Sequence, residues 1–156
     1  MRQQENRRLG VDFLDEIASL KQELLNRLRA SSTLASFVSD RIYDVPHASP
    51  EELTSPYIRF GLFSSEDDGA ECFESFDIVG QIDVYSWGTG EAQSTMEALK
   101  ISAEVTAIIR AFEEDTQLLG GHVLSDIRFR SKRVITASDG KTKHVPITIT
   151  AIVDKT

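Results

Sequence analysis

The 156-residue sequence predicts an α+β fold, a single-domain sandwich in which an antiparallel sheet of four to five strands packs against two long helices. The first observation is the 3.6-residue period of amphipathic helices, which occurs at 11–30 and 91–113. The second is alternation typical of half-buried strands, which occurs at 57–63, 73–87, 122–135 and 142–153. The third is two Asp-Gly turn pairs, at 68–69 and 139–140, which join these strands into two hairpins.

The first helical stretch follows a charged N-terminal arm, residues 1–10, which holds too few apolar residues to fold alone. From Val11 onward apolar residues recur three or four positions apart and form one stripe. The stripe consists of Phe13, Ile17, Leu20, Leu24 and Leu28. We expect this helix to end near Ala30, and a second, short helix to run from Leu34 to Val38.

The first predicted hairpin comes after a short extended piece, 41–44, and a loop whose prolines are unsuited to a central strand. Alternation in 57–63 places three residues on one face: Ile58, Phe60 and Leu62. Alternation in 73–87 does the same for Phe76, Ile78, Ile82 and Val84. The connecting segment, 64–70, is strongly acidic and contains the first Asp-Gly turn.

The second long helix is predicted over 91–113, with Thr89 as its N-cap. Its apolar stripe is Ala98, Ile101, Val105, Ile108 and Phe112. In the last hairpin, the first strand is expected to turn Val123, Ile127 and Phe129 inward. The second strand should turn Val145, Ile147, Ile149, Ala151 and Val153 inward. Two hairpins flanking a helix indicate an antiparallel sheet with its helices on one face.

Charge limits the classes of function. The chain has 17 Lys and Arg residues against 25 Asp and Glu residues, a formal net charge of −8, and its pI is about 4.9. Proteins that bind nucleic acid or anionic membranes generally need a basic surface for phosphate contacts. The balance therefore argues against a general nucleic-acid binder and against a polybasic membrane-surface protein.

The place of synthesis is also predicted. Cys72 is the single cysteine, so no internal disulfide is available and an oxidising compartment is not needed. The basic N-terminus is followed by no apolar stretch typical of a signal peptide, and no apolar run approaches the ~20 residues of a membrane-spanning helix. We therefore expect a protein made in the cytosol, with no membrane partner.

The motifs predict no catalytic, cofactor-binding or metal site. His47, His122 and His144 lie in no spacing that forms a zinc site, and exposed or hydrogen-bonded histidines are the simpler interpretation. Cys72 lies beside acidic neighbours, which disfavour the reactive thiolate. The Gly-Thr-Gly segment at 88–90 lacks the further Gly or the Lys of phosphate-binding loops, so we interpret it as helix capping.

Negative charge is concentrated in one segment. Residues 60–99 hold nine acidic side chains and no Lys or Arg, whereas the rest of the chain holds 16 acids and 17 bases. The densest part, which we name the acidic hairpin, is Glu66, Asp67, Asp68, Glu71 and Glu74. Its spacing does not follow an EF-hand calcium loop. Either it is a solvated loop, or it is a channel or docking surface that repels a polyanion or binds a basic partner.

Positive charge gathers near the C-terminus. Arg128, Arg130 and Lys132, which we name the basic strand, alternate along one predicted strand and are expected on one face, away from the core. One interpretation is protection of an edge strand by charge. The other is a subunit or partner interface, because a molecule with separate acidic and basic regions is suited to head-to-tail association in a ring.

Several segments, in chain order, resemble the tail-completion (tail-terminator) proteins of long-tailed bacteriophages. They are residues 41–46, 55–58, 82–86, 139–144 and 149–153. The likeness covers roughly residues 12–153. The charged arm and the acidic hairpin depart from the usual pattern of the family.

The resemblance implies that residues 11–156 form an α+β domain that assembles into a hexameric ring and has no known catalytic role. Such a ring caps the tail tube, faces the head-side connector or stopper protein, and lets DNA pass without binding it specifically. It implies a structural virion protein at the head-proximal end of the tail, made in the cytoplasm of a bacterial host. Its partners would be itself, the tail tube protein and the connector. Gene-transfer particles and contractile tails use similar proteins.

Two other functions stay open on the sequence alone. One is a different head–tail joining ring protein, a stopper or an adaptor. The other is a small α+β ligand-binding domain or enzyme whose site no motif reveals. A deep pocket with converging polar groups would favour that last alternative.

Overall fold

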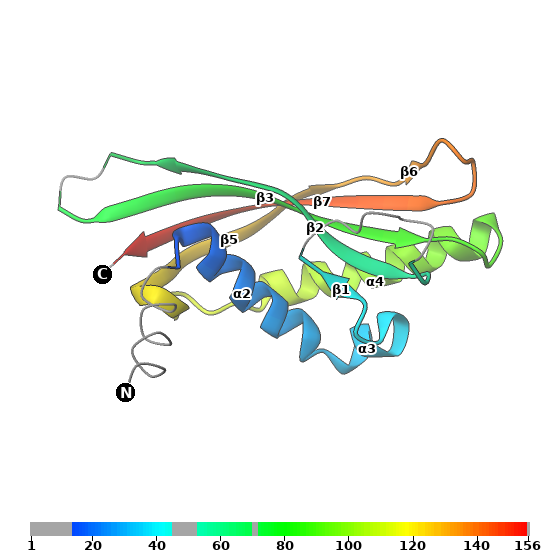
Figure 1. The fold of residues 1–156 in the computed structure, drawn as a ribbon, viewed down its shortest axis with the longest axis horizontal. Coiled ribbons are helices and arrows are strands. Elements are labelled where there is room, and N and C mark those ends of the chain that lie inside the picture. The colour runs from blue at the N-terminus through cyan, green and yellow to red at the C-terminus, as the bar shows by residue number, and fades with distance from the viewer. Residues whose placement is uncertain (1–13, 45–52, 70–71, 156) are drawn as a thin grey trace, which may run out of the picture.

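The computed structural model describes residues 14–44, 53–69 and 72–155, and it has the predicted α+β class (Figure 1). The helices are α2 (Glu16–Arg29), α3 (Ser32–Val38) and α4 (Glu91–Arg110), with a 3₁₀ turn at Leu119–Gly121. The strands are β1 (Ile42–Tyr43), β2 (Tyr57–Asp67), β3 (Glu74–Ser86), β4 (Thr116–Gln117), β5 (His122–Lys132), β6 (Ile135–Thr136) and β7 (Lys143–Lys155). The predicted arm, residues 1–10, lies outside the described residues.

The described part of the chain forms a seven-stranded sheet in the order β1-β2-β3-β7-β5-β4, with β6 pairing to β7. The four long strands β2, β3, β7 and β5 are antiparallel to their neighbours, whereas β1 runs parallel to β2. The expectation of four to five antiparallel strands was therefore only partly right. Of the additional strands, β1 lies within the predicted extended piece 41–44. The strands β4 and β6 have two residues each, which is too short to produce a visible alternation.

The helix ends follow ordinary capping chemistry. Asp15 is the N-cap of α2, and its Oδ1 accepts a hydrogen bond of 2.7 Å from the backbone nitrogen of Ala18. At α4 the N-cap is Gly90, with φ of 93°, and not the predicted Thr89. The Thr89 hydroxyl instead lies 3.0 Å from Ser94 Oγ. Both long helices carry Glu in the first turn and Arg in the last, which suits the helix dipole.

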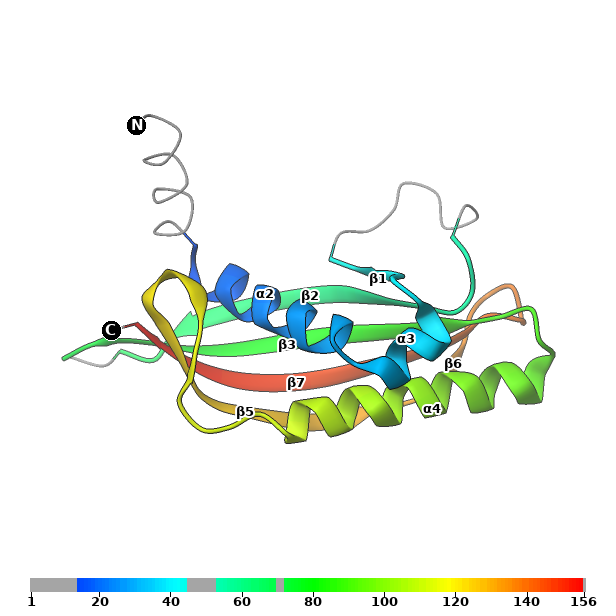
Figure 2. The same cartoon turned by 90° about the horizontal axis from the view of Figure 1, so that it is seen from below.

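The core lies between the helices and one face of the sheet (Figure 2). α2 buries Leu20, Leu24 and Leu28 from its predicted stripe, and α4 buries Ala98, Ile101 and Val105. The sheet contributes Ile58, Phe60, Ile78, Ile82, Val84, Val145, Ile147, Ile149, Ala151 and Val153, all buried as predicted. The opposite face of the sheet is covered by none of the described helices, as is common in antiparallel sheets.

β-Bulges change which side chains face the core. In β2 the register with β3 shifts between Phe60 and Phe63, and an extra residue reverses the alternation beyond that point. Phe63 consequently packs against the core, whereas Leu62, which was expected to face inward, is 80% exposed. In β5 a similar shift follows Leu124, which is buried in place of the predicted Val123.

Gly80 of β3 lies directly under the displaced Phe63 ring. A Cβ atom at Gly80 would come within 2.4 Å of Phe63 Cε1. Gly80→Ala therefore has to push Phe63 off the core, and we expect it to lower the free energy of unfolding by about 1–3 kcal/mol in urea denaturation. Val79→Ala, at an exposed position of the same strand, should change it by less than about 0.5 kcal/mol. Equal effects of the two variants would contradict this packing.

Candidate functional site

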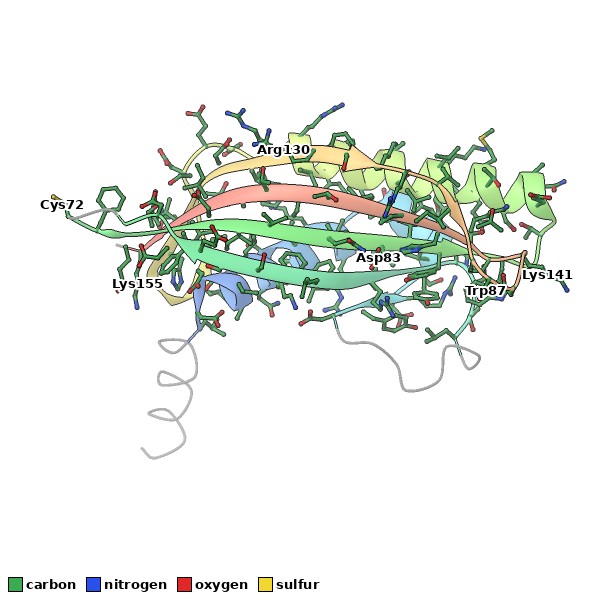
Figure 3. The ribbon with its side chains drawn as sticks, turned by 90° about the horizontal axis from the view of Figure 1, so that it is seen from above. Cys72, Asp83, Trp87, Arg130, Lys141 and Lys155 are labelled. Carbon is green, nitrogen blue, oxygen red and sulfur yellow. The ribbon has the colours of Figure 1, made fainter. Side chains whose placement is uncertain are left out.

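The candidate functional surface comprises the uncovered face and the two open edges of the sheet (Figure 3). At one edge β1 pairs with β2 only at residues 58–59. At the other edge β4 pairs with β5 only at residues 123–124. Within the described ranges, no strand pairs with the remaining outer edge of β2, residues 61–67, or of β5, residues 125–132. Unpaired edges are templates for pairing with another chain.

The acidic hairpin is the projecting end of β2 and β3, beyond the end of α2 (Figure 1). Glu66, Asp67, Asp68 and Glu74 are exposed there, and Glu71 lies outside the described residues. Asp67 Oδ1 accepts a hydrogen bond of 2.7 Å from the backbone nitrogen of Gly69, which forms the turn. The structure thus brings the described members of the acidic hairpin together at one tip of the molecule.

Two members of the basic strand lie on the uncovered face. Arg128 pairs in register with Thr150, and Arg130 Nε donates a hydrogen bond of 2.7 Å to Thr150 Oγ1. Both side chains are exposed, and Arg128 also forms an ion pair with Asp126 at 2.8 Å. As predicted, these two arginines point away from the core.

Lys132 does not share that face, so the prediction that all three bases lie together was wrong. A second bulge in β5, between Phe129 and Ser131, reverses the alternation before Lys132. Lys132 pairs in register with the buried Ile147, and its Nζ lies 3.5 Å from Ser102 Oγ on α4. Its ammonium group therefore lies on the helix side of the sheet edge.

Asp83 is a buried carboxylate on the uncovered face, with 2% of its side chain exposed (Figure 3). Its Oδ1 accepts a hydrogen bond of 2.8 Å from Gln81 Nε2 and lies 2.7 Å from His144 Nε2. Its Oδ2 lies 3.8 Å from Arg59 Nη2. Gly61 leaves room for this oxygen, because a Cβ atom there would lie 2.8 Å from it. These contacts tie together β2, β3 and β7.

Stacked rings surround the Asp83 cluster. Tyr85 stacks on Tyr57 at a centroid distance of 4.8 Å and on His144 at 4.4 Å, and Trp87 packs edge-on against Tyr57. The Tyr85 hydroxyl accepts a hydrogen bond of 2.9 Å from Arg59 Nη2. Burial, together with the charge of Asp83, raises the pKa of Tyr85 to about 12. The cluster is therefore a polar and aromatic patch at one end of the uncovered face, joined by ring stacking and hydrogen bonds.

The turn between β6 and β7 borders a pocket of about 490 Å³ that Tyr57, Tyr85 and Trp87 also line. Asp139 in this turn accepts hydrogen bonds from the Thr142 hydroxyl and from the backbone nitrogens of Thr142 and Lys141. These bonds, chiefly that of the Thr142 side chain, lower the pKa of Asp139 from 3.8 to about 2.

The Asp139 pKa makes a direct prediction for the stability of the turn. A lowered pKa means that the carboxylate stabilises the folded turn above pH 4, and that this contribution is lost as the pH falls from about 4 to about 2. An NMR titration of the side-chain carboxyl should show the low pKa in the wild type. Thr142→Val should move it back toward 3.8. An ordinary pKa in the wild type would contradict the hydrogen-bonded turn.

The two described histidines occupy structural positions. His122 is buried, and its Nδ1 lies 3.0 Å from Ser19 Oγ, while His144 contacts Asp83 and His47 lies outside the described residues. Among residues 14–44, 53–69 and 72–155, no group of three or more His, Cys, Asp or Glu side chains is placed to hold a metal ion. No described helix is long and apolar enough to cross a bilayer.

Asp83 and its partner Arg59 were not among the site residues predicted from the sequence. A signal was present, because an aspartate between Ile82 and Val84 stands in the middle of a strongly apolar strand, where aspartate is disfavoured. Alternation alone assigns such a residue to the solvent face. The contact with His144 depends on the pairing of β3 with β7, which connects residues far apart in the chain.

Known proteins share both the sequence pattern and the fold. The family model described as "Tail completion protein gp17" matches residues 22–154 of this chain. Among solved structures, a chain of the "Virion of native gene transfer agent (GTA) particle" superposes with a TM-score of 0.72 and 19% identity. That superposition covers 88% of this chain and 96% of that one. No curated protein sequence matches.

The family match defines the class of this protein as a structural component of the virion tail, which works together with other tail proteins. The chain belongs to the tail completion protein gp17 family. The resemblance drawn from the sequence segments is thereby confirmed, and so is the expected place of the protein in the virion tail.

Proposed function

We propose that six copies of this chain form a closed ring at the head-proximal end of the tail tube. The ring joins the tube to the head-side connector or stopper protein and lets DNA pass through its centre without specific binding. Residues 11–156 form the ring domain, and residues 1–10 are an arm that contacts a neighbouring subunit or partner. The observation that carries this proposal is the tail completion family match over residues 22–154.

The geometry of the sheet supports a ring. The open edges of β2 and β5 lie on opposite sides of the sheet and differ in charge. A contact between two different surfaces of identical subunits is heterologous, and it closes into a ring when the rotation between subunits divides a full turn. The chain is a structural protein in this proposal and carries out no catalysis.

A binding assay tests the position of the ring. Purified chain is mixed separately with isolated tail tubes and with DNA-filled heads, and the complexes are viewed by electron microscopy. We expect added density at one end of the tubes, and capped tubes that then join heads. Binding to heads but not to tubes would contradict a tail-completion ring and would indicate a stopper or adaptor.

The acidic hairpin gives a prediction for DNA passage. Replacing Asp68 by Asn and Glu71 and Glu74 by Gln, which leaves the open β2 edge at residues 61–67 unchanged, should leave particle assembly intact and slow DNA delivery. The reason is that a wall of like charge shortens the residence of phosphates on it. Delivery is measured as the rate of DNA release into host cells. Glu113→Gln with Glu114→Gln, at exposed positions outside the hairpin, is the control.

Two outcomes would contradict the channel assignment of the acidic hairpin. Failed tail joining, with joining in the wild type already weakened by salt, would indicate that the hairpin docks on a basic partner. Exposed charges are screened within about 8–10 Å at moderate ionic strength, so docking of this kind must depend on salt. Normal joining and normal delivery would leave the hairpin as a solvated loop.

A further inference from the structure

We infer that neighbouring copies are joined by strand pairing, with the open edge of β2 in one copy against the open edge of β5 in the next. This inference rests on the proposed ring and specifies its contact. The surfaces are residues 61–67 of β2 and residues 125–132 of β5, and the partner is a second copy of this chain.

The open edge of β2 has backbone groups available for such pairing. The Asp68 backbone nitrogen donates to the Ser75 carbonyl oxygen at 3.0 Å. In an antiparallel pair, the backbone N–H and C=O groups of successive residues point alternately toward the partner strand and away from it. The backbone N–H groups of Ser65 and Asp67 therefore point away from β3, toward the open edge. This edge contains no Lys or Pro of the kind that protects exposed strands, and it presents Leu62 to solvent.

Strand directions allow the pairing. β2 and β5 are separated by β3 and β7, and each neighbouring pair is antiparallel, so β2 and β5 run in opposite directions. When copies are related by rotation about an axis roughly along the strands, β5 of one copy beside β2 of the next continues the antiparallel alternation. The sheets of successive subunits then form one continuous sheet around the ring.

The two edges carry opposite charge on the same face. Glu66 pairs in register with Asp77, which is exposed on the uncovered face of β3. Arg128 and Arg130 extend from β5 on that uncovered face. Opposite charges across paired strands stabilise the pairing, and like charges destabilise it. The arginines therefore favour the β2 edge of a neighbour over the β5 edge of another copy.

The register within the sheet defines the offset between copies. Glu66 of β2 is paired with Asp77 of β3, Asp77 with Ile152 of β7, and Ile152 with Asp126 of β5. Glu66 and Asp126 therefore lie at the same height along the strand direction. A ring without offset would place these two carboxylates opposite each other. An offset of two residues along the strand places Glu66 opposite Arg128 instead. We therefore assign the Glu66–Arg128 pair to the contact.

Two variants at Ser65 test the backbone contact. Ser65→Pro and Ser65→Ala both lose the 2.8 Å hydrogen bond from Ser65 Oγ to Glu16, but only proline lacks the outward N–H. Circular dichroism checks the fold of each variant, and native mass spectrometry measures the ring. We expect Ser65→Ala to keep the ring and folded Ser65→Pro to raise the ring dissociation constant at least tenfold. Equal ring stability of the two folded variants would overturn the inference.

A disulfide trap remains decisive if Ser65→Pro does not fold. In a Cys72→Ser background, Glu66→Cys with Arg128→Cys should give, on oxidation, a covalent ladder of oligomers that reduction removes. Glu113→Cys with Arg128→Cys should stay monomeric on the same gel. A folded, ring-forming Glu66→Cys/Arg128→Cys protein without a ladder overturns the inference and leaves the ring standing. A wild-type chain that forms no ring, alone or with tail tubes, would instead refute the proposed function.

Discussion

Asp83→Ala is expected to lower the free energy of unfolding by about 3 kcal/mol. Breaking a buried ion pair by removing one partner costs about 3–5 kcal/mol, and the lower end applies here because Arg59 and His144 keep some contact with water. Urea denaturation of the wild type and the variant measures the difference. The loss of Asp83 should also loosen the stacked aromatic side chains. Asp83 contacts His144 and Arg59, and these two residues hold Tyr85 in place through stacking and a hydrogen bond.

Asp77→Ala is the matched control for Asp83→Ala. Asp77 lies on the same strand and on the same uncovered face, but its side chain is exposed. We expect a change of less than about 0.5 kcal/mol for this control. A cost for Asp83→Ala no larger than that of Asp77→Ala would show that the cluster does not stabilise the sheet.

Reversing the charge of the two outward arginines, Arg128→Glu with Arg130→Glu, is expected to weaken the ring strongly. Each exposed ion pair is worth about 0.2–1 kcal/mol, and reversal replaces attraction by repulsion, so two positions change each contact by about 1–3 kcal/mol. The effect repeats at every contact around the ring. Native mass spectrometry over a range of protein concentrations should show that the variant ring dissociates at protein concentrations where the wild-type ring stays intact. The difference should be largest at low salt.

Arg133→Glu with Lys141→Glu is the control for that reversal. It changes the net charge of the chain by the same amount, but Arg133 follows the end of β5 and Lys141 is exposed in the turn between β6 and β7. We expect the ring of this variant to resemble that of the wild type. Equal weakening by both pairs would assign the effect to net charge, and no weakening by Arg128→Glu with Arg130→Glu would leave these arginines as edge protection.

The elements with long, regular patterns could be predicted from the sequence. The stripe from Ala98 to Val105 places α4 correctly, and the alternation from Val145 to Val153 identifies β7 and the face that it turns to the core. In both cases one periodicity holds over the whole element, so local sequence and tertiary burial agree.

The features that were missed depend on tertiary structure. A bulge inserts one residue and turns the following side chains to the other face, which exposed Leu62 and moved Lys132 to the helix side. No local motif marks these bulges in the sequence. Asp83 was missed for a related reason, because its burial depends on Arg59 and His144 from neighbouring strands.

The mass of the assembled wild-type chain distinguishes a closed ring of six copies from every other assembly. Native mass spectrometry of the full chain, alone and after addition of tail tubes, should show one discrete closed species of six copies of the 17.4 kDa chain. A closed ring has a single mass, because a heterologous contact that closes leaves no free surface for further copies. A monomer under both conditions, or an open-ended series of masses, would exclude the closed ring of six copies.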